Sequence, residues 1–167
     1  MNPEKSNLAT AADDARPLGD VLDFLRLIWA IDHALQKASK HMESTLGITG
    51  PQRFALRLIG RFPGITAGEL ARLMKVHPST LTGVLARLEG RRLMIRQLDQ
   101  RDRRRAHLHL TAEGCTMDRQ VEGTVEGVVQ KVLAEHPAAA LEATRTVLEA
   151  LAREMVQGLE SQARLAS

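Results

Sequence analysis

The sequence of 167 residues carries 23 Lys and Arg against 20 Asp and Glu, a net charge of +3, and 44% of its residues are hydrophobic. This length suits one domain with extensions, and the apolar fraction excludes disorder over most of the chain. A lone cysteine, Cys115, excludes an intramolecular disulfide and predicts a reducing, cytoplasmic setting. No signal peptide and no membrane contact are expected, because no apolar run approaches the roughly 20 residues of a membrane span. Four aromatic residues and no tyrosine exclude binders of RNA or single strands that depend on stacking.

The charge is unevenly divided along the chain. Residues 51–111 contain thirteen basic and four acidic residues, a net charge of +9, whereas residues 1–50 and 112–167 have net charges of −2 and −4. A basic segment between acidic ones is typical of a polyanion binder, because Lys and Arg placed on phosphates release condensed counterions. An ordinary solvated surface explains a charge surplus equally well, so the local pattern has to decide.

The first third of the chain predicts a tail and a long helix. Residues 1–16 are small, polar and charged, which is typical of a loosely held tail. Apolar residues then recur every three or four positions over residues 18–46, which predicts one amphipathic helix that Gly47 ends.

Two short helices are expected next. Pro51, in a first helical turn, opens a helix whose inward face we predict to hold Phe54, Leu58 and Ile59. Thr66 and Glu69 then have the spacing of a capping box, in which each side chain accepts from the backbone N–H of the other residue. The helix that follows is predicted to be buried through Leu70, Leu73 and Met74.

A further helix is predicted from Pro78 to about Arg91. One face is apolar, with Leu81, Val84, Leu85 and Leu88. The opposite face is small and hydroxylated, with Ser79, Thr82, Gly83 and Ala86, and with Thr80 and Arg87 at its borders. A short helix, a tight turn and such a second helix are typical of a helix-turn-helix, in which small side chains allow a close approach to base edges. Any surface helix may be lined in this way, so this pattern alone leaves both interpretations open.

Two strands follow, over residues 93–98 and 106–110. The second alternates strictly and points Ala106, Leu108 and Leu110 toward the core, so the other face, with His107 and His109, is expected to look outward. The segment between them, residues 99–105, contains four arginines. A helix-turn-helix followed by a basic β-hairpin is a winged helix, and arginine suits a wing because its planar fork binds phosphate and enters a narrow minor groove.

The last third predicts two long helices. Thr111 is a good N-cap for a helix that continues to about Ala134, and after a break at Pro137 a final helix runs over residues 138–165. The apolar stripes of these helices and of the first one exceed what a small winged domain covers, so they need a partner, most simply a second copy of the chain.

Residues 49–114 resemble the core of the MarR (multiple antibiotic resistance regulator) family of winged-helix transcription factors. Three stretches carry the resemblance: ITGPQRFALRLI, TAGELARLMKVHPSTLTGVLARLE and DQRDRRRAHLHLTAEG. The resemblance implies a mostly α fold with a small β-hairpin wing, and a homodimer formed through the terminal helices. It further implies binding to a pseudo-palindromic double-stranded operator and repression that a small-molecule effector or an oxidant relieves, with no enzymatic activity and no cofactor.

The resemblance also assigns roles to residues. Ser79, Thr80, Thr82 and Arg87 would serve the recognition helix. In the wing, Arg104 would enter the minor groove and Asp102 would orient its guanidinium, while the remaining wing contacts would come from Arg101, Arg103 and Arg105. The family usually has glycine just before the first wing strand, where this chain has Arg91 and Arg92, and Gly83 replaces a residue that is often polar.

We therefore predict four parts: a tail over residues 1–16, an N-terminal dimerisation helix over 17–48, a winged helix-turn-helix over 49–111, and C-terminal dimerisation helices over 112–167. Trp29 and His33, one turn apart, are candidates for lining an effector pocket, although an interface role for Trp29 is the more economical interpretation.

Competing interpretations remain for a few residues. Cys115 is a candidate thiol redox sensor, because thiol oxidation triggers some MarR relatives, but those relatives carry the thiol on the first helix with tyrosine partners, and this chain has no tyrosine. The His107-x-His109 pair suggests a metal site, yet no third ligand stands nearby. Phosphate-loop, zinc-protease and nucleophile-elbow motifs are missing, which argues against an enzyme. A winged helix used for protein contacts is the other alternative, and it gives no reason for four arginines at the wing.

Overall fold

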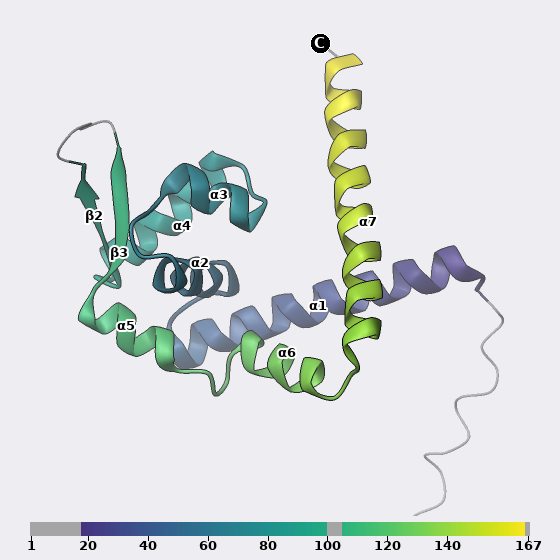
Figure 1. Ribbon diagram of the computed structural model, residues 1–167, viewed down its shortest axis with the longest axis horizontal. Helices are drawn as coiled ribbons and strands as arrows, with labels where there is room; N and C mark the ends of the chain where they lie inside the picture. Colours follow the sequence, from purple (N-terminus) through teal and green to yellow (C-terminus); the bar gives the residue numbers. More distant parts are fainter. Residues whose placement is uncertain (1–17, 100–104, 166–167) are drawn as a thin grey trace, which may run out of the picture. The chain divides into compact units, whose positions relative to one another are not determined.

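The computed structural model describes residues 18–99 and 105–165, with side chains up to Gly158. Within this part the fold is mostly α with one small sheet (Figure 1). The helices are α1 (Asp20–Leu46), α2 (Gly50–Arg61), α3 (Ala67–Met74), α4 (Pro78–Gly90), α5 (Ala112–Arg119), α6 (Val125–Ala134) and α7 (Ala138–Leu165), and the strands are β1 (Ile65–Thr66), β2 (Met94–Leu98) and β3 (Ala106–Leu110). The chain divides into two compact units, one ending at Asp118 and the other beginning at Arg119.

Helix α1 is the long helix that the sequence predicts. Asp20 and Asp23 in its first turn complement the helix dipole, and Gly47 ends it in the left-handed conformation at φ 68°. Its only buried residue is Met42, near the C-terminal end. Most of its apolar stripe is therefore exposed, including Val21 and Trp29.

The sheet has the order β1-β3-β2 and is antiparallel throughout. Strands β2 and β3 confirm the predicted hairpin, and Met94 pairs with Leu110 while Leu98 pairs with Ala106. Strand β1 was not predicted, because two residues are too short to show an alternating pattern. It pairs Ile65 with Leu108 and so joins the start of α3 to the wing.

The hydrophobic core lies between α2, α3, α4 and the sheet. The predicted inner face of α4 is buried at Leu81, Leu85 and Leu88, and Leu108 of β3 is fully buried with them. Two predicted core residues are wrong, because Phe54 is 50% exposed and Leu73 is 49% exposed. Leu70 is buried as predicted, and other residues of the same helices are buried as well, namely Gln52, Arg53 and Leu56 in α2 and Ala71 in α3.

The prediction of one helix from Thr111 to Ala134 is also wrong. The chain forms α5, leaves the helical conformation after Arg119, and starts again as α6 at Val125. Gly123 has a φ of 74°, which a continuous helix excludes. Thr124 then caps α6 by accepting a hydrogen bond from the N–H of Gly127 and donating to the carbonyl oxygen of Val121.

Helix α7 has the predicted bounds and begins directly after Pro137. In the unit from Arg119 onward, Thr124 is the one buried residue among those whose side chains are described, and no hydrophobic side chain there is buried. Large apolar side chains are exposed on both helices, among them Val128, Val132, Leu148 and Met155. In the described part of the chain, no helix is both long enough and apolar enough to cross a membrane.

Candidate nucleic-acid interface

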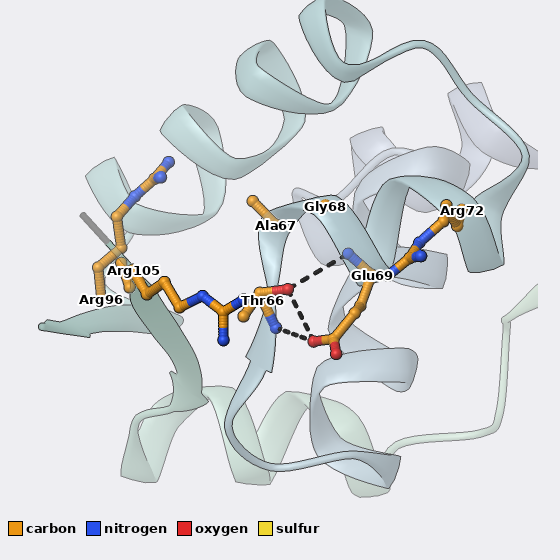
Figure 2. A pocket seen from close by; sticks show the side chains of 8 residues that line it. Thr66, Ala67, Gly68, Glu69, Arg72, Arg96 and Arg105 are labelled. Atoms are coloured by element: carbon orange, nitrogen blue, oxygen red, sulfur yellow. Dashed lines mark hydrogen bonds between the residues drawn. The ribbon is translucent and has the colours of Figure 1, made fainter. Parts of the chain in front are cut away.

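The capping box at the start of α3 is present as predicted. The N–H of Thr66 donates to Glu69 Oε2 at 2.8 Å, the Thr66 hydroxyl donates to the same oxygen at 2.7 Å, and the N–H of Glu69 donates to Thr66 Oγ1 at 3.3 Å (Figure 2). These hydrogen bonds from Thr66 lower the pKa of the Glu69 carboxyl below its ordinary value. The box fixes where the first helix of the helix-turn-helix begins, directly beside β1.

The turn between α3 and α4 is set by two residues. Lys75 ends α3 in the left-handed conformation at φ 53°. His77 is the N-cap of α4: its Nδ1 accepts from the N–H of Ser79 at 3.3 Å and lies 2.7 Å from Ser79 Oγ. Pro78 then occupies the first helical position, as the sequence predicts. The role of His77 is not visible in the sequence, because Ser, Thr, Asp and Asn are the usual N-cap residues.

The outer face of α4 is fully accessible. The candidate residues Ser79, Thr80, Thr82 and Arg87 are all exposed, and so are Gly83 and Ala86 between them. The Thr82 hydroxyl donates to the carbonyl oxygen of Pro78 at 2.9 Å, which leaves its oxygen lone pairs free to accept. The structure thus places the four candidates on one accessible surface opposite the buried leucines.

The wing candidates are only partly within the described chain. Arg101, Asp102, Arg103 and Arg104 lie outside the described residues. Arg105 is exposed, and its carbonyl oxygen accepts a hydrogen bond from the N–H of Asp99 at 3.0 Å. This bond closes the described part of the hairpin at the two residues that flank 100–104 in the sequence.

A concave surface lies between the hairpin and the start of α3. It is lined by Arg72, Arg96 and Arg105 together with Glu69 and the backbone around Gly68 (Figure 2). Arg96 also pairs with Glu89 of α4, at 3.1 Å between Nε and Oε2. Three arginines line this surface beside Glu69, whose carboxylate already accepts hydrogen bonds from Thr66, so the surface is suitable for a phosphate backbone.

His107 lies at the base of the same hairpin, and the expectation that it looks outward is wrong. Its Nδ1 is 2.7 Å from the carbonyl oxygen of Gly64, and its Nε2 is 3.0 Å from Asp99 Oδ2. The side chain is half-buried because the turn before β1 covers this face of β3. The hydrogen bond to Asp99, then that to Gly64, raise the pKa of His107 above its ordinary value of 6.5.

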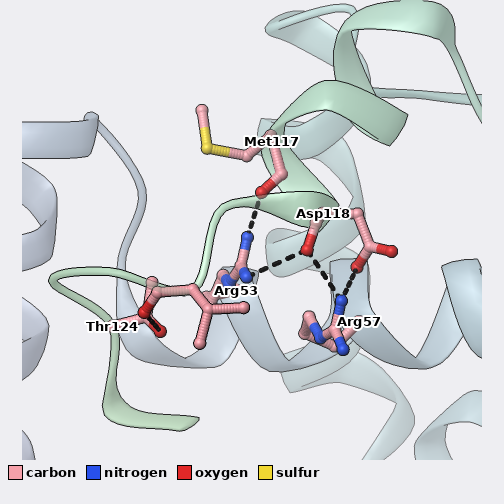
Figure 3. Close-up of polar contacts among 6 residues, drawn as sticks. Arg53, Arg57, Met117, Asp118 and Thr124 are labelled. Carbon is pink, nitrogen blue, oxygen red and sulfur yellow. Dashed lines mark hydrogen bonds and ion pairs between the residues drawn. The ribbon is translucent and has the colours of Figure 1, made fainter. Parts of the chain in front are cut away.

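Two arginines of α2, the buried Arg53 and the half-buried Arg57, hold the end of α5. Arg53, which is 2% exposed, donates from Nη1 to the carbonyl oxygen of Met117 and from Nη2 to that of Asp118 at 3.2 Å (Figure 3). Arg57 donates to the same carbonyl oxygen of Asp118 at 2.7 Å and to its carboxylate at 2.8 Å. The last carbonyls of a helix carry partial negative charge, so two cations stabilise this helix end where the first unit finishes. No local sequence pattern reveals this contact, because its partners are more than 60 residues apart.

Comparisons with known proteins decide the family. A family model described as "MarR family" matches residues 48–106. The HTH-type transcriptional repressor Rv2887 of Mycobacterium tuberculosis is 31% identical over 140 residues, covering 84% of this chain and 96% of that protein. The chain belongs to the MarR family.

Solved MarR-family structures agree with this assignment. The crystal structure of Rv2887 is 26% identical and matches with a TM-score of 0.54 over 82% of this chain and 99% of that one. The regulator SlyA gives 0.68 at 23% identity over 83% and 97% of the two chains. Staphylococcus aureus MepR in its DNA complex gives 0.67 at 20% identity over 78% and 97%. The last two likenesses establish the winged-helix fold.

The departure of this chain from the MarR pattern before the first wing strand has a structural outcome. Arg92 takes the left-handed conformation at φ 57°, the region that favours glycine. Its carbonyl oxygen accepts from the Thr111 hydroxyl at 2.6 Å, so this end of the hairpin is pinned from both strands. Arg91 reaches back and donates to the carbonyl oxygen of Gly47 at the end of α1.

The remaining MarR-type candidates lie on the surface of the first unit. Trp29 is 75% exposed, and His33 is exposed one turn further along α1. Cys115 is a free, exposed thiol on α5. Among the described residues, no group of three or more His, Cys, Asp or Glu is placed to hold a metal ion, so His107 and His109 form no such group with a third side chain there.

Proposed function

We propose that this protein is a homodimeric, sequence-specific regulator of transcription that binds double-stranded DNA and represses until a small-molecule effector releases it. The observation that carries the proposal is the pairing of two surfaces in one basic segment. The polar outer face of α4 is accessible above a buried leucine face, and the arginine-lined hairpin stands next to it.

Each surface suits one groove of the duplex. Helix α4 offers hydroxyls from Ser79, Thr80 and Thr82, with Arg87 beside them, and a helix of this kind reads base edges in the major groove. The wing would supply the minor-groove and phosphate contacts, through Arg101, Asp102, Arg103, Arg104 and Arg105. The MepR relative was solved as a DNA complex, which supports this orientation by analogy of fold.

Exposed apolar faces support the homodimer. Helix α1 presents Val21, Leu22, Leu25 and Trp29, and the second unit presents Val128, Leu148 and Met155. Contiguous apolar surface of this kind is rare on a monomer and is typical of an interface. A symmetric dimer would place two α4 helices on half-sites about one helical turn, roughly 34 Å, apart.

Effector release is the least direct part of the proposal and rests on the resemblance to the family. Trp29 and His33 are the candidate effector contacts, since an indole and an imidazole one turn apart offer an apolar face with a polar edge. A second copy of the chain over α1 would enclose them.

The DNA-binding part is tested by selecting bound duplexes from a random library and measuring affinity by fluorescence anisotropy. Log K should fall steeply with log[salt], because several phosphates are neutralised per subunit. Arg104→Ala should weaken specific binding by roughly 1–3 kcal/mol. The control, Arg145→Ala, removes an exposed α7 arginine paired with Glu142 and should leave affinity unchanged. A DNA affinity that does not depend on salt, or an unchanged affinity of the Arg104→Ala variant, would favour a winged helix used for protein contacts.

The homodimer is tested by light scattering on variants of α7. Leu148→Asp places a charge on the exposed apolar stripe and should produce monomers. Thr146→Asp, on the opposite face of the same helix at 100° per residue, is the matched control and should remain dimeric. Dimers of Leu148→Asp at low micromolar concentration would exclude this face as the interface.

A further inference from the structure

We propose that His107 is a positioning residue for the wing: its protonated ring, donating from both nitrogens, ties the end of β2 at Asp99 to the turn at Gly64. This inference rests on the proposed function, because its consequence for the cell is a wing whose DNA contacts depend on pH. The tie itself is a property of the free protein.

The tie joins two places that the backbone connects only indirectly. Asp99 is the first residue after β2, and its N–H donates to the carbonyl oxygen of Arg105 at the start of the return strand. Gly64 stands before β1, on the far side of β3, and its N–H donates to the carbonyl oxygen of Leu108. Because β3 is the central strand, the imidazole of His107 bridges across it from one edge of the sheet to the other.

The chemistry of the two partners requires the cationic ring. The carbonyl of Gly64 accepts hydrogen bonds and cannot donate, and the same holds for the ionised carboxylate of Asp99. A neutral imidazole carries one N–H, so it satisfies one partner and turns a lone pair toward the other. At 2.7 Å and 3.0 Å, both contacts are hydrogen bonds only when both ring nitrogens are protonated.

The charges around the ring favour that form. Asp99 faces it from the residue after β2 and Glu69 from α3, while the turn and β1 offer uncharged groups. Arg72 and Arg105 lie around Glu69 and partly offset its charge, and His109 stands two residues along the same strand. The net effect is a raised pKa for His107, with Asp99 as its main cause. The tie is therefore fully formed below the ordinary pKa near 6.5 and is lost as pH rises through the higher pKa of the folded protein.

The consequence concerns the segment that starts at Asp99. Residues 100–104, which contain three of the four wing arginines, follow Asp99 and precede Arg105 in the sequence, and these two flanking residues are joined by a hydrogen bond. When Asp99 is held in place, the first residue before that segment is fixed, and this lowers the conformational entropy that DNA binding has to remove. Loss of the tie frees Asp99 and weakens the wing contacts.

The tie is tested first without DNA, by NMR titration of the imidazole nitrogens in the full-length protein. We expect His107 to titrate above the ordinary imidazole pKa of 6.5, with protons on both nitrogens below its pKa. Asp99→Asn should lower the pKa of His107, because Asp99 is the main cause of its rise. A His107 pKa at or below 6.5, or no response to Asp99→Asn, would overturn the proposal whether or not the protein binds DNA.

The effect on the wing is tested by measuring Kd for the selected operator at several pH values and fixed salt. His107→Gln keeps a hydrogen-bonding side chain but cannot titrate. The ratio of its Kd to that of the unsubstituted protein should be about three- to fivefold at low pH, the size of one lost hydrogen bond, and should approach one as His107 deprotonates.

His109→Gln is the matched control, because His109 lies on the same strand and its ring has no comparable hydrogen bond among the described residues. Its Kd ratio should stay constant with pH. A pH-independent ratio for His107→Gln would refute the positioning role even where operator binding itself is normal. Failure of all variants and of the unsubstituted protein to bind any duplex would refute the proposed function instead, and the NMR titration would still decide the tie.

Discussion

The two units of the chain bury their apolar residues in opposite ways. In the unit ending at Asp118, one hydrophobic cluster runs from Ile48 to Leu108 and includes side chains with no exposed surface. In the unit from Arg119, the described hydrophobic side chains are half-buried or exposed, although α7 alone has 28 residues. The first unit thus has a hydrophobic core of its own, whereas the apolar side chains of the second unit stay uncovered within the single chain.

This difference explains the division of charge in the sequence. The unit ending at Asp118 tolerates a net positive surface, because its free energy of unfolding comes from buried side chains and not from surface charges. The helices of the second unit are acidic on their polar faces, and the dimer that we propose would bury their apolar faces. Stability in the first unit should therefore be a property of one chain, and in the second a property of protein concentration.

The largest expected effect is on core packing. Leu56→Ala removes a fully buried side chain of α2 and should lower the free energy of unfolding by about 2–5 kcal/mol at any protein concentration. Leu148→Ala, in the second unit, should shift unfolding by an amount that depends on concentration. Denaturant titrations at two protein concentrations tenfold apart separate these cases. The same concentration dependence for both variants would contradict the proposed difference between the units.

A smaller effect is expected at the arginine pair. Arg53→Ala leaves the carbonyls of Met117 and Asp118 with fewer donors and should cost about 2 kcal/mol. Arg145→Ala breaks an exposed α7 pair with Glu142 and should change stability by less than about 0.5 kcal/mol. Thermal unfolding monitored by circular dichroism distinguishes them. A cost for Arg53→Ala as small as for Arg145→Ala would mean that the end of α5 is held by other contacts.

The smallest expected effect is a gain in helix stability that, in α4, comes with a loss of DNA affinity. Gly83→Ala in α4 and Gly158→Ala in α7 each add a methyl group where nothing lies within 4 Å, and each should stabilise its helix by about 0.5–1 kcal/mol. Only Gly83→Ala should also weaken DNA binding, because its methyl group stands on the face that approaches the bases. Melting temperatures and anisotropy together test this, and equal affinities for the two variants would argue against close approach of α4.

Local signals in the sequence were enough for the hairpin, the capping box and the ends of most helices. Thr66 and Glu69 lie three residues apart, and Gly47 and Pro78 act on their immediate neighbours, so no distant residue is needed to interpret them. The helix-turn-helix and the accessible face of α4 follow from the same local patterns. The roles of the candidate DNA contacts stay predictions.

The errors come from contacts that are distant in sequence. Arg53 is buried because its guanidinium reaches carbonyls 64 and 65 residues away, and this turns Phe54 outward. His107 is covered by a turn 43 residues earlier in the chain. The break before α6 was missed for another reason: valines continue at helical spacing on both sides of Gly123, so periodicity alone does not register the interruption.

The C-terminal end of α1 restricts which residue can stand at position 47. A Cβ atom on Gly47 would lie 2.9 Å from the guanidinium of Arg91, and the left-handed φ of 68° independently disfavours any side chain. A side chain at this position would therefore strain the backbone and push the Arg91 guanidinium away from the carbonyl oxygen of Gly47. With 27 residues at a rise of 1.5 Å, α1 is about 40 Å long, and Arg91 ties its C-terminal end to the end of α4.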